Sequence, residues 1–278
     1  MHRGYPSRER RGRLSRRTVL ITGASAGIGA AMARVFAGKG WDLILTARRV
    51  AALEALAAEL RVTGASVTVL TADLAEPAAP ATLISQIAAR GLVVDGLVNN
   101  AGFSRTTGFV ASDPAQLAAE IRVMLTAPVE LSHLVLPGMV ARSFGRIINV
   151  ASIAGLMPAT GGDTLYGPIK SFLIKASQGL YLETEGTGVH VTALCPGYTF
   201  TEFHDVNGSR AEVTSAYPRW MWMTAEAVAR AGYDGVEANR PRVVPGWRNR
   251  LLSFIPKLLP NDVALNIIAG HARRLKRL

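Results

Sequence analysis

Three residues in the second half of the chain could carry out acid–base chemistry together: Ser152, Tyr166 and Lys170. Tyr166 and Lys170 are four residues apart, so on a helix they lie on one face about one turn from each other. A phenol ionises near pH 10, but a neighbouring ammonium group stabilises the phenolate and brings proton exchange into range. Ser152 follows an apolar run and could hold a substrate oxygen by a hydrogen bond. A Tyr-x-x-x-Lys pair alone is typical of a surface helix, so the interpretation depends on the residues that accompany it.

A glycine-rich segment near the N-terminus predicts a phosphate-binding turn. Residues 22–29 read Thr-Gly-Ala-Ser-Ala-Gly-Ile-Gly, after the apolar residues 19–21 and before an alanine-rich stretch. This order is typical of a buried strand, a tight turn and a helix whose N-terminus presents unpaired N–H groups to an anion. Gly23 permits the turn, Gly27 permits close approach of a ligand, and Gly29 permits close packing of helix on strand. The spacing differs from that of a P-loop, and an ordinary strand–helix turn remains the alternative.

Short β-branched runs alternate with longer alanine- and leucine-rich segments over residues 18–250. We expect strands at 18–22, 42–47, 66–71, 96–98, 145–150 and 189–195, a weaker strand at 242–245, and helices at about 28–39, 50–62, 78–90, 113–141, 164–185 and 224–238. This alternation predicts an α/β fold with a doubly wound parallel sheet, Rossmann-like, in three α/β/α layers. Ligands of such folds lie beyond the carboxyl ends of the strands, where the glycine segment and Ser152 would meet.

The residues after the second expected strand bear on the type of cofactor. A carboxylate there would accept hydrogen bonds from the adenosine ribose and repel a 2′-phosphate. Ala47 takes that place and is followed by Arg48 and Arg49, whose guanidinium groups suit a phosphate. The sequence therefore favours NADP(H) over NAD(H), with Arg48 placed ahead of Arg49, although both arginines could simply begin a solvated helix.

In combination these motifs resemble those of the short-chain dehydrogenase/reductase family. The resemblance covers about residues 18–205 and rests on segment 22–29, Asp73, the Asn-Asn-Ala-Gly run 99–102, Ser152, Tyr166, Lys170 and the Pro-Gly pair 196–197. It implies hydride transfer between a nicotinamide and a carbonyl or alcohol. Tyr166 would protonate the carbonyl oxygen, Ser152 would orient it, and Lys170 would bind the nicotinamide ribose and lower the pKa of Tyr166.

The resemblance and the two arginines together define an expected cofactor site. Within it, Asp73 would face the adenine, Asn100 would line the cofactor channel, and Thr201 would contact the nicotinamide carboxamide. The expected site comprises Gly23, Ser25, Ala26, Gly27, Ile28, Gly29, Arg48, Arg49, Asp73, Leu74, Asn100, Ala101, Gly102, Tyr166, Lys170, Pro196, Gly197 and Thr201.

One position departs from the family pattern. In the family, the helix that corresponds to the one expected at 113–141 usually carries an asparagine, which holds a water chain leading from the lysine. In this chain Met124 takes the place of that asparagine. A thioether is a weak acceptor and cannot donate a hydrogen bond, so either a neighbour such as Thr126 substitutes or turnover is slower. A cofactor-binding sensor or scaffold with weak or no turnover is therefore the alternative to an oxidoreductase. Pro168 is compatible with a helix that begins near residue 164, because proline fits a first helical turn.

The formal net charge of +11 is concentrated at the two ends of the chain. Residues 1–17 contribute +6 and residues 271–278 contribute +4, which leaves +1 for the 253 residues between them. Basic tails are more often solvated arms than specific sites, so nucleic-acid binding is not expected, whereas contact with a membrane surface stays open. We expect a disordered basic leader at 1–17, one catalytic domain at 18–250 with a substrate lid at about 200–240, and an apolar, then basic, extension at 251–278 that packs as a lid or attaches to a membrane surface.

The remaining residues give weaker indications. The five histidines are scattered, so no metal site is expected. A single cysteine, Cys195, excludes an internal disulfide and fits a cytoplasmic location. No segment of about eighteen apolar residues predicts a membrane-spanning helix. The Trp-Met-Trp-Met run at 220–223 either belongs to the core or lines an apolar pocket. The expected substrate is ketoacyl, sterol-like or another apolar ketone or aldehyde, and the resemblance implies a homodimer or homotetramer formed through helices 113–141 and 164–185.

Overall fold

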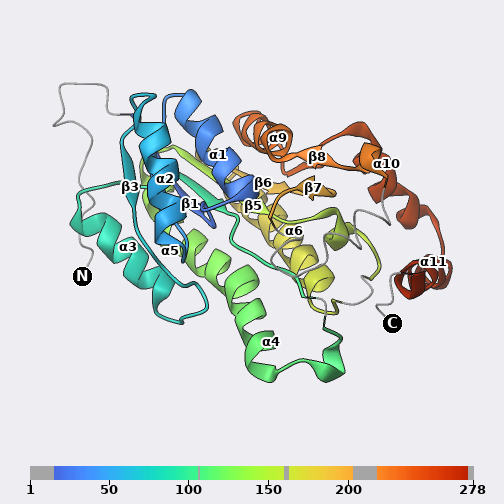
Figure 1. Cartoon of the computed structure of the whole chain (residues 1–278). Coiled ribbons are helices and arrows are strands. Elements are labelled where there is room, and N and C mark those ends of the chain that lie inside the picture. Colours follow the sequence, from blue (N-terminus) through green and yellow to red (C-terminus); the bar gives the residue numbers. More distant parts are fainter. Residues whose placement is uncertain (1–15, 106, 160–162, 203–217, 275–278) are drawn as a thin grey trace.

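A seven-stranded parallel sheet forms the middle layer of the protein (Figure 1). The computed structural model describes residues 16–105, 107–159, 163–202 and 218–274. The strands lie in the order β3-β2-β1-β4-β5-β6-β9. β2 and β3 are added on one side of β1, and the later strands of this sheet, from β4 onward, are added on its other side. Their bounds are β1 (Thr18–Thr22), β2 (Asp42–Thr46), β3 (Val67–Val69), β4 (Gly96–Asn99), β5 (Gly145–Val150), β6 (Val189–Leu194) and β9 (Arg242–Val243). The expected doubly wound parallel sheet is confirmed.

Helices cover both faces of the sheet. One face packs against α1 (Gly27–Gly38), α2 (Val50–Arg61) and α9 (Ala225–Glu237), and the other against α3 (Ala79–Ala89), α5 (Ala127–Ala141) and α6 (Tyr166–Glu183). Val19 and Ile21 of β1 point into the first layer and Leu20 into the second, and all three are fully buried. Strands covered on both faces need apolar residues at every position, which explains their continuous apolar runs.

The helix expected over 113–141 is divided into three parts. α4 (Pro114–Ile121) leads into a π-helical turn, η3 (Arg122–Thr126), and then into α5. The widened turn lies just before Pro128, which has no N–H to donate to the carbonyl of Met124 four residues earlier. By length and composition the run 114–141 could cross a membrane, but half of its most apolar window is buried inside the fold. Burial of this kind is typical of a core helix.

The C-terminal part of the described chain adds helices beyond β9. They are α10 (Trp247–Phe254), the short η6 (Ile255–Leu258) and α11 (Asn261–Arg274), and they lie at the end of the molecule away from β3 (Figure 1). A small parallel pair, β7 (Thr199–Phe200) and β8 (Met223–Thr224), lies before them. Of the expected lid at 200–240, residues 203–217 lie outside the described residues, and α9 packs against α1 in the core. Of the expected leader, residues 1–15 also lie outside the described residues.

Candidate active site

The turn between β1 and α1 has a backbone that favours glycine. Gly23 and Gly27 have φ angles of +63° and +56°, in the left-handed region that other residues adopt only with strain. A Cβ atom on Gly29 would collide with the carbonyl oxygen of Gly23 and lie 2.5 Å from the Asn100 amide nitrogen. No larger residue fits at Gly29 without displacing the turn.

The N-terminus of α1 is open to an anion. Ala26 occupies the N-cap without a side-chain hydrogen bond, and the first turn of the helix contains no acidic residue. The N–H groups of Gly27, Ile28 and Gly29 therefore have neither an intrahelical acceptor nor a capping side chain. Together with the helix dipole they fit a pyrophosphate group, as the sequence predicts.

Asn100 holds this turn in place from the neighbouring strand. Its side-chain amide donates to the carbonyl oxygens of Thr22 at 2.9 Å and Gly23 at 3.1 Å. The backbone N–H groups of Asn100 and Ala101 both donate to the Thr22 hydroxyl, at 2.9 and 3.0 Å. Asn100 therefore fixes the shape of the turn, a role that the expectation of a channel-lining residue did not include.

Of the two arginines after β2, Arg49 is the one that contacts the turn. Its Nε and Nη2 donate to the Ser25 hydroxyl at 3.3 and 3.2 Å, and Nη2 lies 2.8 Å from a carboxylate oxygen of Glu202. Arg48 is exposed. Arg49 is exposed as well, and its guanidinium lies beside the anion-binding turn. The ranking of Arg48 ahead of Arg49 as the partner of a 2′-phosphate stays a prediction.

The other expected cofactor residues lie along the same edge of the sheet. Asp73 is exposed and accepts the N–H of Ala75 at 3.0 Å, and the next residue, Leu74, is buried. The carbonyl oxygen of Pro196 accepts the N–H of Ile153 at 2.9 Å.

Two of these residues are fixed by close packing. A Cβ atom on Gly197 would lie 2.5 Å from the Asn249 side-chain oxygen, and one on Gly27 would lie 3.0 Å from Cβ of Thr201. Gly197 therefore permits α10 to approach the sheet edge, and Thr201 lies directly beside the glycine turn.

Ser152, Tyr166 and Lys170 come together where β5 ends. Ser152 caps the short helix η4 (Ile153–Leu156) by accepting the N–H of Ala154 at 3.1 Å, and its hydroxyl is hydrogen-bonded to the Tyr166 phenol. Tyr166 is the first residue of α6. Lys170, one turn later, is buried, and its Nζ donates to the carbonyl of Val150 at 2.9 Å. The Nζ atom lies 5.5 Å from the centre of the Tyr166 ring.

Loss of solvation shifts the pKa values of Tyr166 and Lys170 in opposite directions. Burial raises the pKa of Tyr166 to about 12, the hydrogen bond from Ser152 opposes the rise, and the charges of Asp163 and Glu120 add to it. Burial lowers the pKa of Lys170 to about 8. The lowering of the Tyr166 pKa by Lys170 stays a prediction. Loss of solvation is the largest cause of the raised Tyr166 pKa. The phenol therefore keeps its proton at neutral pH and can act as a proton donor.

Met124 lies at the inner end of the site. It is buried in η3, and a Cβ atom on Gly102 would lie 3.1 Å from its sulfur and 3.7 Å from Lys170 Nζ. The thioether therefore occupies space beside the lysine ammonium, to which it offers only a weak acceptor. Pro168 lies in the first turn of α6, as the sequence predicts.

A buried charged cluster behind Tyr166 was not found from the sequence. Asp163 accepts the N–H of Tyr166 at 3.3 Å and that of Arg105 at 2.9 Å. Glu120 of α4 is fully buried, lies 3.8 Å from Arg105 Nε, and is hydrogen-bonded to the Asp163 side chain. Burial, followed by the charge of Asp163, raises the pKa of Glu120 to about 7. These three residues come from separate segments, so no local sequence pattern signals them.

A buried network of amide and hydroxyl groups joins β4 and β5 to α5 and α6, and it was also not found from the sequence. The Asn99 amide donates to Asn149 Oδ1 at 2.8 Å and to the Ser132 hydroxyl at 3.1 Å. The Asn149 amide then donates to the Ser177 hydroxyl at 2.9 Å. All four side chains are buried, so their hydrogen bonds fix β4 and β5 relative to α5 and α6.

The apolar run 220–223 divides between core and surface. Trp222 is buried, with its ring centre 5.4 Å from that of Tyr198 and 5.0 Å from that of Phe200. Trp220 is exposed. Trp222 is therefore part of the packing that supports the small sheet β7–β8, and the run does not act as one unit.

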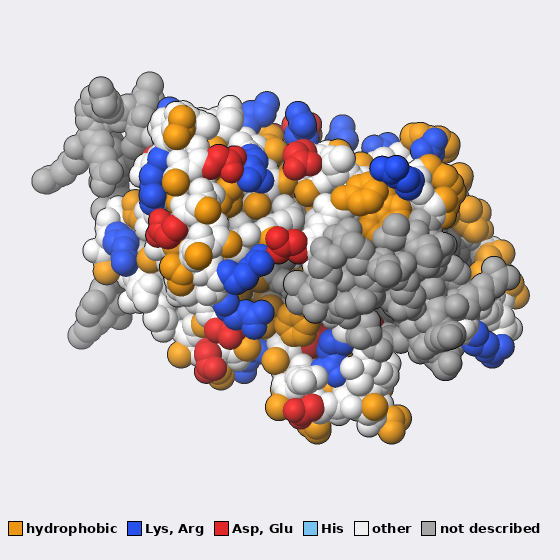
Figure 2. All heavy atoms as spheres, viewed as in Figure 1, with side chains coloured by type: hydrophobic (Ala, Val, Ile, Leu, Met, Phe, Trp, Pro, Cys, Tyr) orange, Lys and Arg blue, Asp and Glu red, His pale blue; other side chains and the backbone are white. Residues whose placement is uncertain are grey.

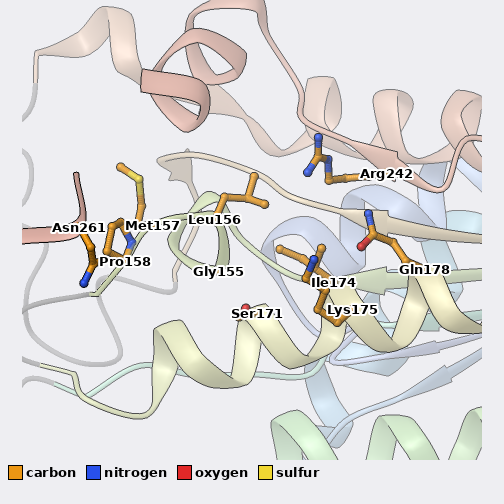
Figure 3. A pocket seen from close by; sticks show the side chains of 10 residues that line it. All are labelled: Gly155, Leu156, Met157, Pro158, Ser171, Ile174, Lys175, Gln178, Arg242 and Asn261. Carbon is orange, nitrogen blue, oxygen red and sulfur yellow. The ribbon is translucent and has the colours of Figure 1, made fainter. Parts of the chain in front are cut away.

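A hollow of about 310 Å³ lies between η4, α6 and the first residue of α11 (Figure 3). Leu156 and Ile174 line it together with the polar side chains of Lys175, Gln178 and Arg242. Ser152, Tyr166 and Lys170 are not among its lining residues. This hollow is therefore separate from the place where the phenol proton is available.

The open helix N-terminus, the half-buried Ser152 and Tyr166 and the buried Lys170 together fit a dinucleotide-dependent oxidoreductase. Residues 17–211 match the family described as short chain dehydrogenase, and the chain belongs to that family. It is 36% identical over 190 residues to oxidoreductase UcpA of Escherichia coli K12, which covers 68% of this chain and 72% of that protein.

Solved structures agree with this assignment. The chain resembles a short-chain dehydrogenase from Sphingobium yanoikuyae in complex with NADPH, with 36% identity, a TM-score of 0.75 and coverage of 83% of this chain and 88% of that one. It also resembles a bulky-bulky ketone specific alcohol dehydrogenase from Comamonas testosteroni, with 29% identity, a TM-score of 0.71 and coverage of 87% and 93%.

Proposed function

We propose that the protein is a cytoplasmic NADP(H)-dependent carbonyl reductase or alcohol dehydrogenase acting on a hydrophobic ketone or aldehyde. The observation that carries the proposal is the hydrogen-bonded pair of Ser152 and Tyr166, with its high phenol pKa, at the sheet edge that also holds the glycine turn. Cys195, which is buried and not in a disulfide, supports a reducing compartment.

In the reduction direction the nicotinamide supplies a hydride when it is bound. The Ser152 hydroxyl and the Tyr166 phenol both donate hydrogen bonds to the substrate carbonyl oxygen, which polarises the carbonyl and fixes its orientation. As negative charge develops on that oxygen, the phenol proton moves to it from Tyr166 Oη. The Lys170 ammonium, 5.5 Å from the ring, stabilises the resulting phenolate. In the oxidation direction the same groups act in reverse.

The arginines after β2 support a preference for NADP(H). Ala47 leaves no carboxylate to repel a 2′-phosphate, and the Arg49 guanidinium lies beside the glycine turn at Ser25. The related Sphingobium protein holds NADPH. In this proposal the 2′-phosphate competes with Glu202 for Arg49, and the exposed Arg48 supplies a second positive charge.

The surroundings of Tyr166 support an apolar substrate, whether ketoacyl, sterol-like or another ketone or aldehyde. Tyr166 packs against a buried apolar cluster that includes Leu74, Met124 and Ile169. The Comamonas relative is described as specific for bulky-bulky ketones. We place a homodimer or homotetramer contact on α5 and α6, where Val129 and Phe172 are exposed.

The test is turnover by the purified full chain with NADPH and a panel of apolar ketones and aldehydes. We expect oxidation of NADPH at 340 nm with at least one substrate, and weaker activity with NADH. The sensor or scaffold alternative has one motivating observation, Met124 beside Lys170. Tight NADPH binding without turnover, unchanged by Met124→Asn, would favour that alternative and contradict the proposal.

A further inference from the structure

Helix α10 has its large apolar side chains on the outside. Trp247, Leu251 and Phe254 are 67%, 52% and 55% exposed, whereas the inward face carries Asn249 and Ser253, both buried. A helix on a globular protein normally shows the opposite arrangement, with the apolar face inward.

The inward face of α10 is fixed by specific contacts. The Asn249 amide donates to the carbonyl of Pro245 at 3.0 Å and lies 3.4 Å from the sulfur of Met223 in β8. Asn249 also packs directly on Gly197, where a Cβ atom would not fit. Rotation of the helix would break these contacts, so the outward direction of the apolar face is built into the fold.

The exposed apolar face continues beyond α10. The spacing of four, three and four residues places Trp247, Leu251, Phe254 and Leu258 along one side of α10 and η6. Ile255 is exposed as well, and in the next helix, α11, Val263 and Ile267 are exposed at a spacing of four. We name these seven side chains the C-terminal apolar surface: Trp247, Leu251, Phe254, Ile255, Leu258, Val263 and Ile267.

Arginines border this surface. Arg240, Arg242 and Arg250 line a hollow of about 680 Å³ that Trp247 and Phe254 also line. Figure 2 shows basic and hydrophobic side chains next to each other over the end of the molecule where Figure 1 labels α10.

Arg248 adds a further positive charge beside the exposed tryptophans. Its guanidinium lies 5.2 Å from the centre of the Trp247 ring and 5.6 Å from that of Trp220. From residue 240 to the C-terminus the sequence holds nine Lys or Arg and one acidic residue, Asp262. The segment that carries the apolar surface is therefore strongly positive.

This combination distinguishes between the possible occupants of the surface. A second copy related by a two-fold axis would bring two segments of formal charge +8 against each other, which is unfavourable. An anionic bilayer offers an acyl boundary for the apolar side chains and phosphates for the arginines. At about 1.5 Å per residue, the 8 residues of α10 and the 14 of α11 are too short to span a bilayer core of about 30 Å.

We propose that α10, η6 and α11 dock the protein on the surface of an anionic membrane, with the C-terminal apolar surface in the boundary between headgroups and acyl chains. Arg240, Arg242 and Arg250 bind lipid phosphates in the hollow beside it. The docked helices lie in the plane of the membrane, and the protein does not cross it. Docking does not depend on the reductase activity, so each of the two proposals can fail without the other.

The test is co-sedimentation of the full chain with large vesicles of phosphatidylcholine, with or without 30 mol% phosphatidylglycerol. We expect binding to the anionic vesicles, little binding to the neutral ones, and weaker binding as NaCl rises from 50 to 300 mM. Leu251→Asp/Phe254→Asp should reduce the partition coefficient at least tenfold. The triple variant Arg240→Gln/Arg242→Gln/Arg250→Gln should have a partition coefficient lower by on the order of a hundredfold. This corresponds to about fivefold for each arginine near an anionic surface.

The matched control is Val62→Asp/Val110→Asp, which adds the same charge at two exposed valines outside the C-terminal helices. This variant should bind like the wild type. NADPH affinity and melting temperature should be unchanged in all variants, which separates loss of docking from loss of folding. Equal binding to neutral and anionic vesicles, or full binding by Leu251→Asp/Phe254→Asp, would overturn the proposal. A change from oligomer to monomer in that variant, with membrane binding unchanged, would assign the surface to a second copy and also overturn it.

Discussion

Replacement of Glu120 by glutamine should make the protein more stable above neutral pH. The pKa of Glu120 is raised from 4.5 to about 7, chiefly because the carboxyl group is buried and secondly because Asp163 is close. A difference of about 2.5 pKa units corresponds to about 3 kcal/mol. This is a net value, since the attraction of Arg105 for the carboxylate already opposes the rise.

The sign follows from proton binding. Between pH 4.5 and about 7 the folded protein holds the Glu120 proton more tightly than the unfolded chain does, so the free energy of unfolding falls as pH rises through that window. Below pH 4.5 the carboxyl is protonated in both the folded and the unfolded state, so it does not lower the free energy of unfolding. Above pH 7 the carboxyl is ionised in both states, and the free energy of unfolding is lowered by the full amount. Glutamine has the shape of the neutral acid and does not ionise, so it avoids this loss of stability.

The assay is urea unfolding of wild type and Glu120→Gln at half-unit steps from pH 4.5 to pH 8.5. The variant should gain little at the acid end and about 3 kcal/mol at pH 8. Glu54→Gln, at an exposed glutamate of α2, is the matched control and should give the wild-type profile. A Glu120→Gln protein that is less stable than wild type at pH 8 would contradict this prediction. It would show that the attraction between the Glu120 carboxylate and Arg105 stabilises the fold by more than the loss of solvation of the carboxylate destabilises it.

Three further predictions concern the cofactor site and the proton path. Gly29→Ala should weaken NADPH binding at least tenfold in a fluorescence titration, because its Cβ collides with the Gly23 carbonyl oxygen; wild-type affinity would contradict that geometry. Arg49→Ala should raise the Kd of NADPH by about tenfold or more, the usual loss for a charge-assisted hydrogen bond, and leave that of NADH nearly unchanged; equal losses for both would exclude a 2′-phosphate contact. Met124→Asn should raise kcat severalfold at constant KM, because an amide beside Lys170 can both donate and accept; a lower kcat would show that the thioether is needed there for packing.

The layered fold could be predicted because its signals are local. Apolar runs between turn residues located β1 and β5 at their observed bounds, and the glycine turn between β1 and α1 had the expected backbone. The break in the helix over 114–141 was not predicted. Composition and periodicity favoured one long helix. Pro128 cannot donate a hydrogen bond to the carbonyl of Met124, and at this point the helix continues through a π-helical turn instead of ending.

The candidate catalytic residues could be selected from their types and spacing, whereas the surroundings that set their pKa values could not be predicted. The pKa of Tyr166 depends on burial and on Asp163 and Glu120, which lie on other segments. For the same reason the contacts of Arg48 and Arg49 could not be predicted. Two adjacent arginines look alike in a sequence, and only the path of the backbone after β2 decides which of them meets Ser25.

The most direct test of the account is the activity of Tyr166→Phe with NADPH and a ketone that the wild type reduces. The substitution removes only the phenol oxygen, whose proton is transferred in the proposed mechanism. We predict a loss of kcat of at least about a hundredfold, the usual contribution of a general acid, with the Kd of NADPH within about twofold of wild type. A Tyr166→Phe protein that retains wild-type kcat would contradict the central claim.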